Sequence, residues 1–74
     1  MRTMNEHIRV HLNGEDRDVA AGLTVRGLLE SLALEPRLVV VERNREILSR
    51  SRYDEVEVHE GDTLELVHFV GGGS

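Results

Sequence analysis

The sequence predicts an α+β domain in which a mixed sheet of about four to five strands packs around one helix. Three patterns lead to this prediction: an early strand followed by Asn-Gly, one helical apolar stripe, and further strand-forming runs in the second half. The 74 residues suffice for one domain, which we place at residues 7–70, between flexible segments at 1–6 and 71–74. At this size a sheet around a single helix covers each apolar face.

The first element is a predicted strand in which Ile8, Val10 and Leu12 alternate with polar residues. Asn13-Gly14 follows at once, and this pair is a strong hairpin signal because both residues tolerate positive φ. A second strand is therefore expected to run back from Glu15 to Val19. Its charged residues are typical of a sheet edge.

One helix is predicted after this hairpin, with Thr24 as its N-cap. Its apolar residues are spaced i, i+3, i+4 and i+7, at Val25, Leu28, Leu29 and Leu32. Pro36 disfavours the helical conformation for Glu35, so the helix should end near Leu34.

The residue pattern in the second half of the chain predicts three strands. The run Leu38–Val41 is typical of a central strand with both faces covered, and it should lie under the helix. Ile47-Leu48 can form a very short strand, and the last strand should run from Thr63 to Val70. Tyr53 is interpreted as an anchor in the core rather than as a catalytic phenol. This order of elements is that of a β-grasp, or ubiquitin-like, architecture.

Composition restricts the function. The formal net charge is −5 and the acidic residues are spread along the chain, so we expect a basic protein surface as partner and no nucleic acid. The absence of cysteine excludes thiolate metal sites and a thiol nucleophile of the chain's own, and it fits a reducing cytosol. No apolar stretch approaches the roughly 20 residues that span a bilayer. We therefore expect a cytoplasmic protein without a membrane partner.

No catalytic or metal-binding constellation is evident in the sequence. His7 and His11 are strand residues with no accompanying constellation of carboxylates, and His68 stands alone, so no metal site is predicted. Glu55 and Glu57 are interpreted as the solvated face of an extended segment. The chain is therefore not expected to be an enzyme.

The C-terminal segment carries the strongest functional signal. A strand-forming run ends at Val70 and is followed by three glycines, Gly71–Gly73, and Ser74. Glycines form a mobile thread that can enter a narrow channel and bring its backbone against another protein's active site. The alternatives are a frayed terminus or a flexible linker.

Val67 and Phe69 fall on the strand face opposite to Leu64 and Leu66, which suggests a contact patch for a partner beside the glycines. The alternative is a bulge that turns Phe69 inward.

The ending Gly61–Gly73 resembles the C-terminus of the ThiS sulfur carriers of thiamine biosynthesis, members of the ThiS/MoaD ubiquitin-like family. The similarity extends over nearly the whole chain. It includes Asn13-Gly14-Glu15, Thr24-Val25, Leu28-Leu29, Val39-Val40-Val41-Glu42-Arg43-Asn44, Arg52-Tyr53 and Glu60-Gly61-Asp62.

This resemblance implies a mechanism in which the chain is a carrier and its partners are the enzymes. A ThiF-like enzyme would use ATP to adenylate the carboxylate of Gly73, and a sulfur donor enzyme would convert the adenylate to a thiocarboxylate. The thiazole synthase ThiG would then take the sulfur. Gly71 and Gly72 would thread the partner's channel, Val67 and Phe69 would help dock, and the chain itself would bind no cofactor.

Two departures from the family pattern stand out. Ser74 follows Gly73, so a protease must remove it before activation, unless Ser74 is not part of the natural chain. Asn44-Arg45 stands where the family often has Asn-Gly, which alters a turn.

Other functions remain open from the residues alone. A MoaD-like carrier for molybdopterin synthesis shares the fold and the activation chemistry, and carriers for cysteine synthesis or transfer-RNA thiolation are further alternatives. A non-covalent β-grasp interaction module, whose glycines are only a linker, is the alternative from another class.

Overall fold

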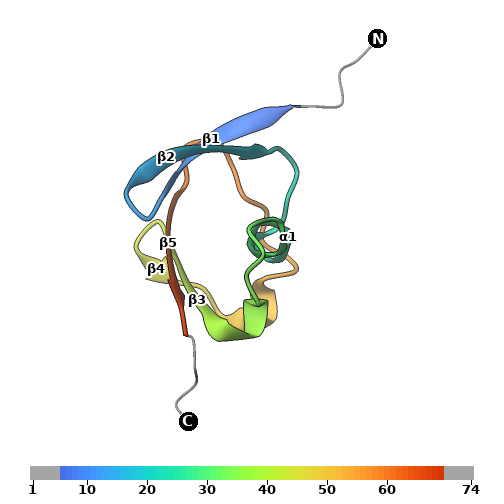
Figure 1. The fold of residues 1–74 in the computed structure, drawn as a ribbon, viewed down its shortest axis with the longest axis vertical. Coiled ribbons are helices and arrows are strands. Elements are labelled where there is room, and N and C mark those ends of the chain that lie inside the picture. The colour runs from blue at the N-terminus through green and yellow to red at the C-terminus, as the bar shows by residue number, and fades with distance from the viewer. Residues whose placement is uncertain (1–5, 70–74) are drawn as a thin grey trace.

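Five strands and one α-helix make up the domain in a computed structural model that describes residues 6–69 (Figure 1). In chain order the elements are β1 (His7–Leu12), β2 (Glu15–Ala20), α1 (Val25–Ser31), the 3-10 turn η1 (Pro36–Leu38), β3 (Val39–Arg43), β4 (Glu46–Ile47), the 3-10 turn η2 (Arg50–Arg52) and β5 (Thr63–His68). The sheet order is β2-β1-β5-β3-β4. Strands β1 and β5 are parallel, whereas the other neighbours are antiparallel. The mixed sheet around one helix confirms the predicted β-grasp.

The β1–β2 hairpin has the predicted register and turn. Leu12 pairs with Glu15 across the two-residue turn, in which Asn13 and Gly14 have φ values of 50° and 85°. Strand β2 lies at the edge of the sheet as expected. It contributes one buried side chain, Val19, to the core.

Helix α1 starts as predicted but ends earlier. The Thr24 hydroxyl accepts a hydrogen bond from the N–H of Gly27 at 3.1 Å, which caps the first turn. The predicted end near Leu34 is wrong, since the helix ends at Ser31. The chain turns left-handed at Ala33, with φ of 62°, and the N–H of Leu34 donates to the carbonyl of Leu29 at 2.9 Å. This closure, a Schellman motif, satisfies the end of the helix before Pro36 is reached.

The core lies between α1 and the inner face of the sheet. Its buried members are Val10, Leu12, Val19, Val25, Leu28, Leu29, Val39, Val41, Tyr53, Val58 and Leu64. Tyr53 is 4% exposed, and its hydroxyl donates a hydrogen bond of 2.8 Å to the carbonyl of Val39. The interpretation of Tyr53 as a core anchor is therefore confirmed.

Strand β3 differs from its prediction in two respects. The centre of the sheet is β5, and β3 lies between β5 and β4. Val39 and Val41 are fully buried, but Val40 between them is only half-buried. The expectation that both faces are covered is wrong, because α1 covers one face of the sheet and, within residues 6–69, no second layer covers the other (Figure 1).

The last two strands lie close to their predicted positions. Strand β4 starts one residue earlier than expected, and β5 covers Thr63–His68 of the predicted last strand. Val70 and the expected flexible segments 1–6 and 71–74 lie outside the described residues, apart from Glu6.

No helix in the described part of the chain is long and apolar enough to cross a membrane.

Candidate docking face beside the C-terminal glycines

The side chains of β5 and of Phe69 point alternately toward the core and toward solvent just before the glycines. Leu64 is fully buried and Leu66 is half-buried, whereas Val67 and Phe69 are 53% and 52% exposed. The N–H of Phe69 donates to the carbonyl of Leu38 at 2.8 Å, so regular pairing with the β3 chain continues to this point. The alternative of a bulge that turns Phe69 inward is therefore wrong.

The register of β3 and β4 extends the outward surface across three strands. Val40 pairs with Val67, and Ile47 on β4 pairs with Glu42 on β3. Ile47 is 73% exposed. We call this surface the docking face and define it by Leu38, Val40, Ile47, Val67 and Phe69.

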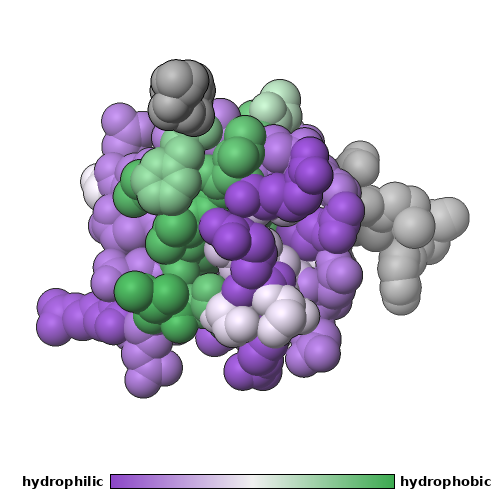
Figure 2. Space-filling model, turned by 90° about the horizontal axis from the view of Figure 1, so that it is seen from below, coloured by the Kyte–Doolittle hydropathy of each residue, from purple (hydrophilic) through white to green (hydrophobic). Residues whose placement is uncertain are grey.

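The docking face lies at the end of the molecule where β5 finishes. Figure 1 shows the end of β5 beside η1 and the start of β3 at the bottom of the view. Seen from that side, Figure 2 shows one band of apolar residues with hydrophilic residues around it. Contiguous exposed apolar surface of this kind marks interaction sites in proteins.

Sequence reasoning found Val67 and Phe69 but missed the other three members. Leu38 and Val40 belong to the run that was assigned to a fully covered strand, and Ile47 was assigned only to a short strand. Register could have identified them, because an antiparallel partner that places Val40 opposite Val67 places both side chains on the same outward face.

A side-chain clamp holds one edge of β5. The side-chain oxygen of Asn13 accepts a hydrogen bond from the N–H of Leu66 at 2.7 Å, and its amide nitrogen donates to the carbonyl of Leu66 at 3.3 Å. The Asn13 N–H also donates to the carbonyl of Leu64 at 2.9 Å. Asn13 thus continues the pairing of β5 beyond the end of β1.

A buried carboxylate holds the start of β5. Asp62 is 6% exposed and accepts hydrogen bonds from Arg43 Nε at 3.1 Å, Asn44 Nδ2 at 3.2 Å and the N–H of His59 at 2.8 Å. Burial alone would raise the pKa of Asp62. The hydrogen bonds and the positive charge of Arg43 outweigh it, so the pKa lies below its usual range. The cluster ties β5 to the β3–β4 turn.

The structure places the predicted tail residues outside its described part. Gly71, Gly72 and Gly73 follow the last described residue, Phe69, so their predicted roles in threading and in carrying sulfur stay predictions. Within residues 6–69 no group of three or more histidine, aspartate or glutamate side chains could hold a metal ion.

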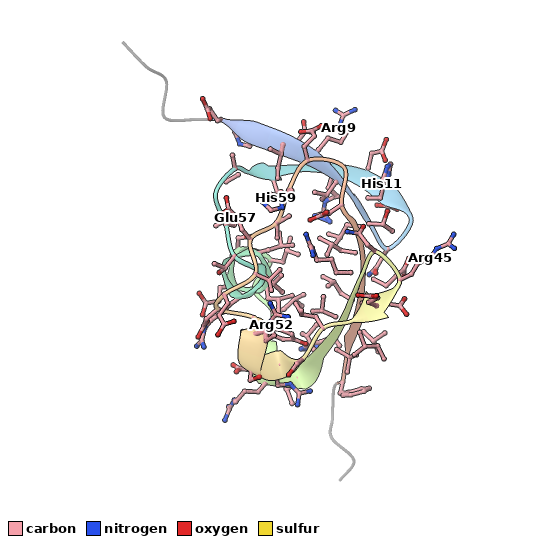
Figure 3. The ribbon with its side chains drawn as sticks, turned by 180° about the vertical axis from the view of Figure 1, so that it is seen from behind. Arg9, His11, Arg45, Arg52, Glu57 and His59 are labelled. Carbon is pink, nitrogen blue, oxygen red and sulfur yellow. The ribbon has the colours of Figure 1, made fainter. Side chains whose placement is uncertain are left out.

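Charged side chains elsewhere lie on several separate elements. His11 on β1 pairs with Asp16 on β2, and Arg9 pairs with Asp18 at 3.0 Å, both on the hairpin. Arg45 projects outward from the β3–β4 turn (Figure 3).

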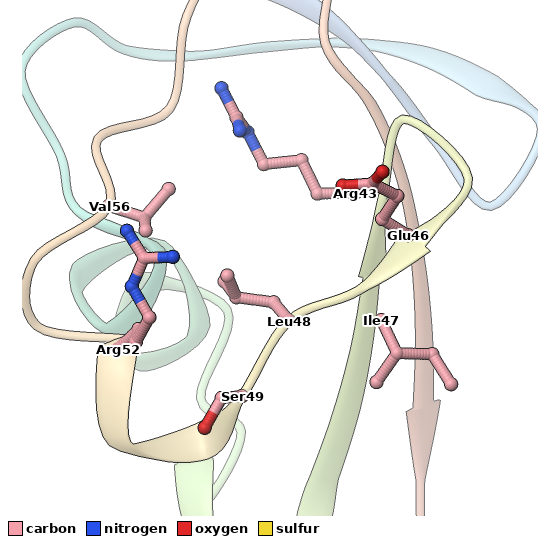
Figure 4. Close-up of a pocket in the computed structure, with 7 residues that line it drawn as sticks. All are labelled: Arg43, Glu46, Ile47, Leu48, Ser49, Arg52 and Val56. Atoms are coloured by element: carbon pink, nitrogen blue, oxygen red, sulfur yellow. The ribbon is translucent and has the colours of Figure 1, made fainter.

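A pocket of about 270 Å³ opens between β4 and η2 (Figure 4). It is lined by Arg43, Glu46, Ile47, Leu48, Ser49, Arg52 and Val56. Both of its guanidinium groups are already paired, Arg43 with Asp62 at 3.1 Å and Arg52 with Glu55 at 3.5 Å. The pocket therefore lacks a free cation that could anchor an anionic ligand.

Comparison with known proteins identifies similar chains over nearly the whole length. The model of the ThiS family matches residues 10–73. A sulfur carrier protein ThiS from Bacillus subtilis is 47% identical over 68 residues, covering 86% of this chain and 98% of that protein. The crystal structure of a ThiS from Geobacter metallireducens superposes with a TM-score of 0.76 at 36% identity, covering 89% of this chain and all of that one.

A second group of similar proteins is much longer. A thiazole synthase from Magnetococcus marinus is 47% identical over 66 residues, which cover 89% of this chain but 20% of that protein. The chain thus spans about a fifth of the length of the thiazole synthases that it matches.

Proposed function

The chain belongs to the ThiS family, and we propose that it is a sulfur carrier protein of thiamine biosynthesis that delivers sulfur from the end of its glycine tail. The observation that carries this proposal is the exposed docking face directly before Gly71–Gly73. A carrier needs both parts: a rigid surface that a partner recognises and a side-chain-free thread that reaches its active site.

The proposed chemistry takes place at the carboxyl group of Gly73. A carboxylate is a poor electrophile, so its oxygen first attacks the α-phosphorus of ATP on a ThiF-like enzyme, and pyrophosphate leaves. A sulfide-level nucleophile from the sulfur donor enzyme then displaces AMP and leaves a thiocarboxylate. The carrier supplies the end group and the handle, whereas the partners supply the catalytic groups. In this sequence the step requires cleavage after Gly73, because Ser74 holds the carboxyl in a peptide bond.

Docking through Val67 and Phe69 would give moderate affinity. Full burial of such a side chain contributes about 1.5–3 kcal/mol, and both are already about half-covered in the free protein. Each would therefore add roughly 1 kcal/mol, or about a fivefold gain in affinity. Moderate affinity suits a carrier that must leave one enzyme and reach the next.

Thiazole synthase is the sulfur acceptor that we propose. The thiazole synthases from Magnetococcus marinus and Paramagnetospirillum magneticum each contain a segment similar to this chain within a much longer protein. Such an arrangement keeps carrier and acceptor at a high effective concentration, which is useful when the two must meet in every cycle.

Activation of defined chain ends tests the carrier function. We would measure ATP–pyrophosphate exchange by the ThiF-like enzyme of the same organism with chains that end at Gly73, at Ser74 or at Val70. Only the chain that ends at Gly73 should support exchange, because only it has both the thread and a free glycine carboxylate. Equal exchange with all three chains would refute the proposal. A non-covalent interaction module predicts no exchange with any chain and unchanged binding after removal of the glycines.

Substitutions on the same strand test the docking face. The double variant Val67→Ala and Phe69→Ala should raise the KM for activation about 25-fold, with the fold unchanged because both side chains point outward. Thr63→Ala is the matched control, since Thr63 is exposed on the same strand at its other end. A KM of the double variant equal to that of the control would exclude this face as the docking site.

A further inference from the structure

The outward face of the sheet continues from apolar to acidic residues. The cross-strand pair next to Val40 and Val67 is Glu42 opposite Glu65, and Ile47 lies opposite Glu42 on the other side. Two carboxylates thus lie beside each other, between an apolar pair on the same two strands and an exposed isoleucine on the next strand. We call Glu42 and Glu65 the acidic pair.

Like charges directly opposite on neighbouring strands destabilise a sheet. Some carboxylates elsewhere on the molecule form ion pairs: Asp18 pairs with Arg9 on the β1–β2 hairpin, Glu30 with Arg26 on α1, and Glu35 with Arg37. Over residues 6–69 neither member of the acidic pair forms an ion pair. The repulsion between Glu42 and Glu65 is therefore retained in the free protein.

The position of the acidic pair makes it relevant to docking. Glu42 is already half-buried, with Val40 two residues before it on β3 and Ile47 opposite it. A partner that covers Val67 and Ile47 together must also remove water from Glu42. Desolvation of a charge is costly unless an opposite charge or hydrogen-bond donors replace the lost water.

We propose that the acidic pair receives an arginine or lysine side chain of the protein that docks on the apolar residues. One cation between Glu42 and Glu65 relieves their repulsion and compensates the desolvation of Glu42. An arginine fits best, because its guanidinium presents several donors and can bridge both carboxylates. This inference rests on the proposed docking function and adds the chemistry of the partner: an apolar surface with a cation at one side.

The test measures binding of the same organism's thiazole synthase to the full chain as sodium chloride is raised. The double variant Glu42→Gln and Glu65→Gln is compared with Glu55→Gln and Glu57→Gln, which changes the net charge equally at exposed positions outside the sheet. The acidic-pair variant should bind at least tenfold more weakly at low salt and lose most of its salt dependence. The control should keep both properties of the unaltered chain.

Two comparisons separate failure of this inference from failure of the docking face. In the first, the double variant Val67→Ala and Phe69→Ala weakens binding while the acidic-pair variant binds like its control. That result would support the docking face and refute the proposal that a cation of the partner binds the acidic pair. If neither variant differs from its control, both proposals fail. The acidic-pair variant should unfold at the same or a higher denaturant concentration, because a repulsion is removed, so a loss of binding cannot be assigned to misfolding.

Discussion

Asn13 and Leu66, which are far apart in the sequence, are joined by two hydrogen bonds of 2.7 and 3.3 Å between the carboxamide of Asn13 and the backbone of Leu66. The carboxamide takes the place of a strand residue beside β5. One residue thus both forms the β1–β2 turn and fixes the strand that leads into the glycine tail.

Replacement of Asn13 by glycine tests this clamp. Glycine keeps the positive φ of the turn but loses the carboxamide, so we expect a loss of about 1–2 kcal/mol in the free energy of unfolding. Amide hydrogen exchange should become faster at Leu66 in particular. In the control Gly14→Ala, the added methyl group has nothing within 4 Å to contact, so any cost comes from backbone strain and the protection of Leu66 should persist. Unchanged exchange at Leu66 in Asn13→Gly would contradict the assigned role.

Acid should destabilise the domain through Asp62. Its pKa in the folded protein is lower than in the unfolded chain, where it is about 3.9. The stabilisation is complete above the unfolded pKa and is lost as the pH falls through the folded pKa. The denaturant concentration at the midpoint of unfolding should therefore decrease as the pH is lowered below about 4, in part because of this group.

Two asparagine variants isolate that contribution. Asp62→Asn removes the charge that faces Arg43 and should lower stability at pH 7 by about 2 kcal/mol, with a flatter acid limb. Asp54→Asn, at an exposed carboxylate 3.6 Å from Arg26, should change stability by less than about 0.5 kcal/mol. Parallel acid limbs for Asp62→Asn and the unaltered protein would show that another group causes the pH dependence.

The β3–β4 turn should be improved by glycine. Asn44 and Arg45 both have positive φ, 51° and 74°, in a two-residue hairpin turn. A left-handed conformation costs a residue with a Cβ roughly 1 kcal/mol, so Arg45→Gly should raise the free energy of unfolding by about 0.5–1 kcal/mol. Thermal unfolding checks this, with Arg50→Gly as a control without a left-handed backbone. A lower melting temperature for Arg45→Gly would mean that Arg45 makes a contribution that the turn geometry does not show.

The hydroxyl of Tyr53 should stabilise the fold through its single hydrogen bond. Tyr53→Phe leaves the packing intact but removes the donor to the carbonyl of Val39, so we expect a loss of about 1–2 kcal/mol. Denaturant unfolding measures this loss. Equal stability of the two proteins would indicate that water replaces the hydroxyl at this carbonyl.

Local signals predicted most of the fold. Asn13-Gly14 fixed the first turn because both residues accept positive φ, and Thr24 fixed the start of α1 because its hydroxyl caps the first turn. The end of α1 was predicted too late, since alanine at a left-handed position gives no warning in the sequence. A glycine at position 33 would have indicated it.

The candidate site was only partly predictable for a different reason. Alternation along β5 places Val67 and Phe69 outward, but their neighbours Val40 and Ile47 are set by the register between strands. Register depends on tertiary pairing, which a run of four apolar residues does not reveal. The acidic pair could not be predicted for the same reason. Glu42 and Glu65 are neighbours only through the pairing of β3 with β5.

The intact mass of the protein, purified from its own cells grown without thiamine and without a functional thiazole synthase, tests the central claim most directly. Blocked transfer should cause the loaded carrier to accumulate. The account predicts a chain that ends at Gly73 in which one oxygen of the terminal carboxyl is replaced by sulfur. A population made up entirely of chains without sulfur, in cells that contain the activating enzyme, would contradict it.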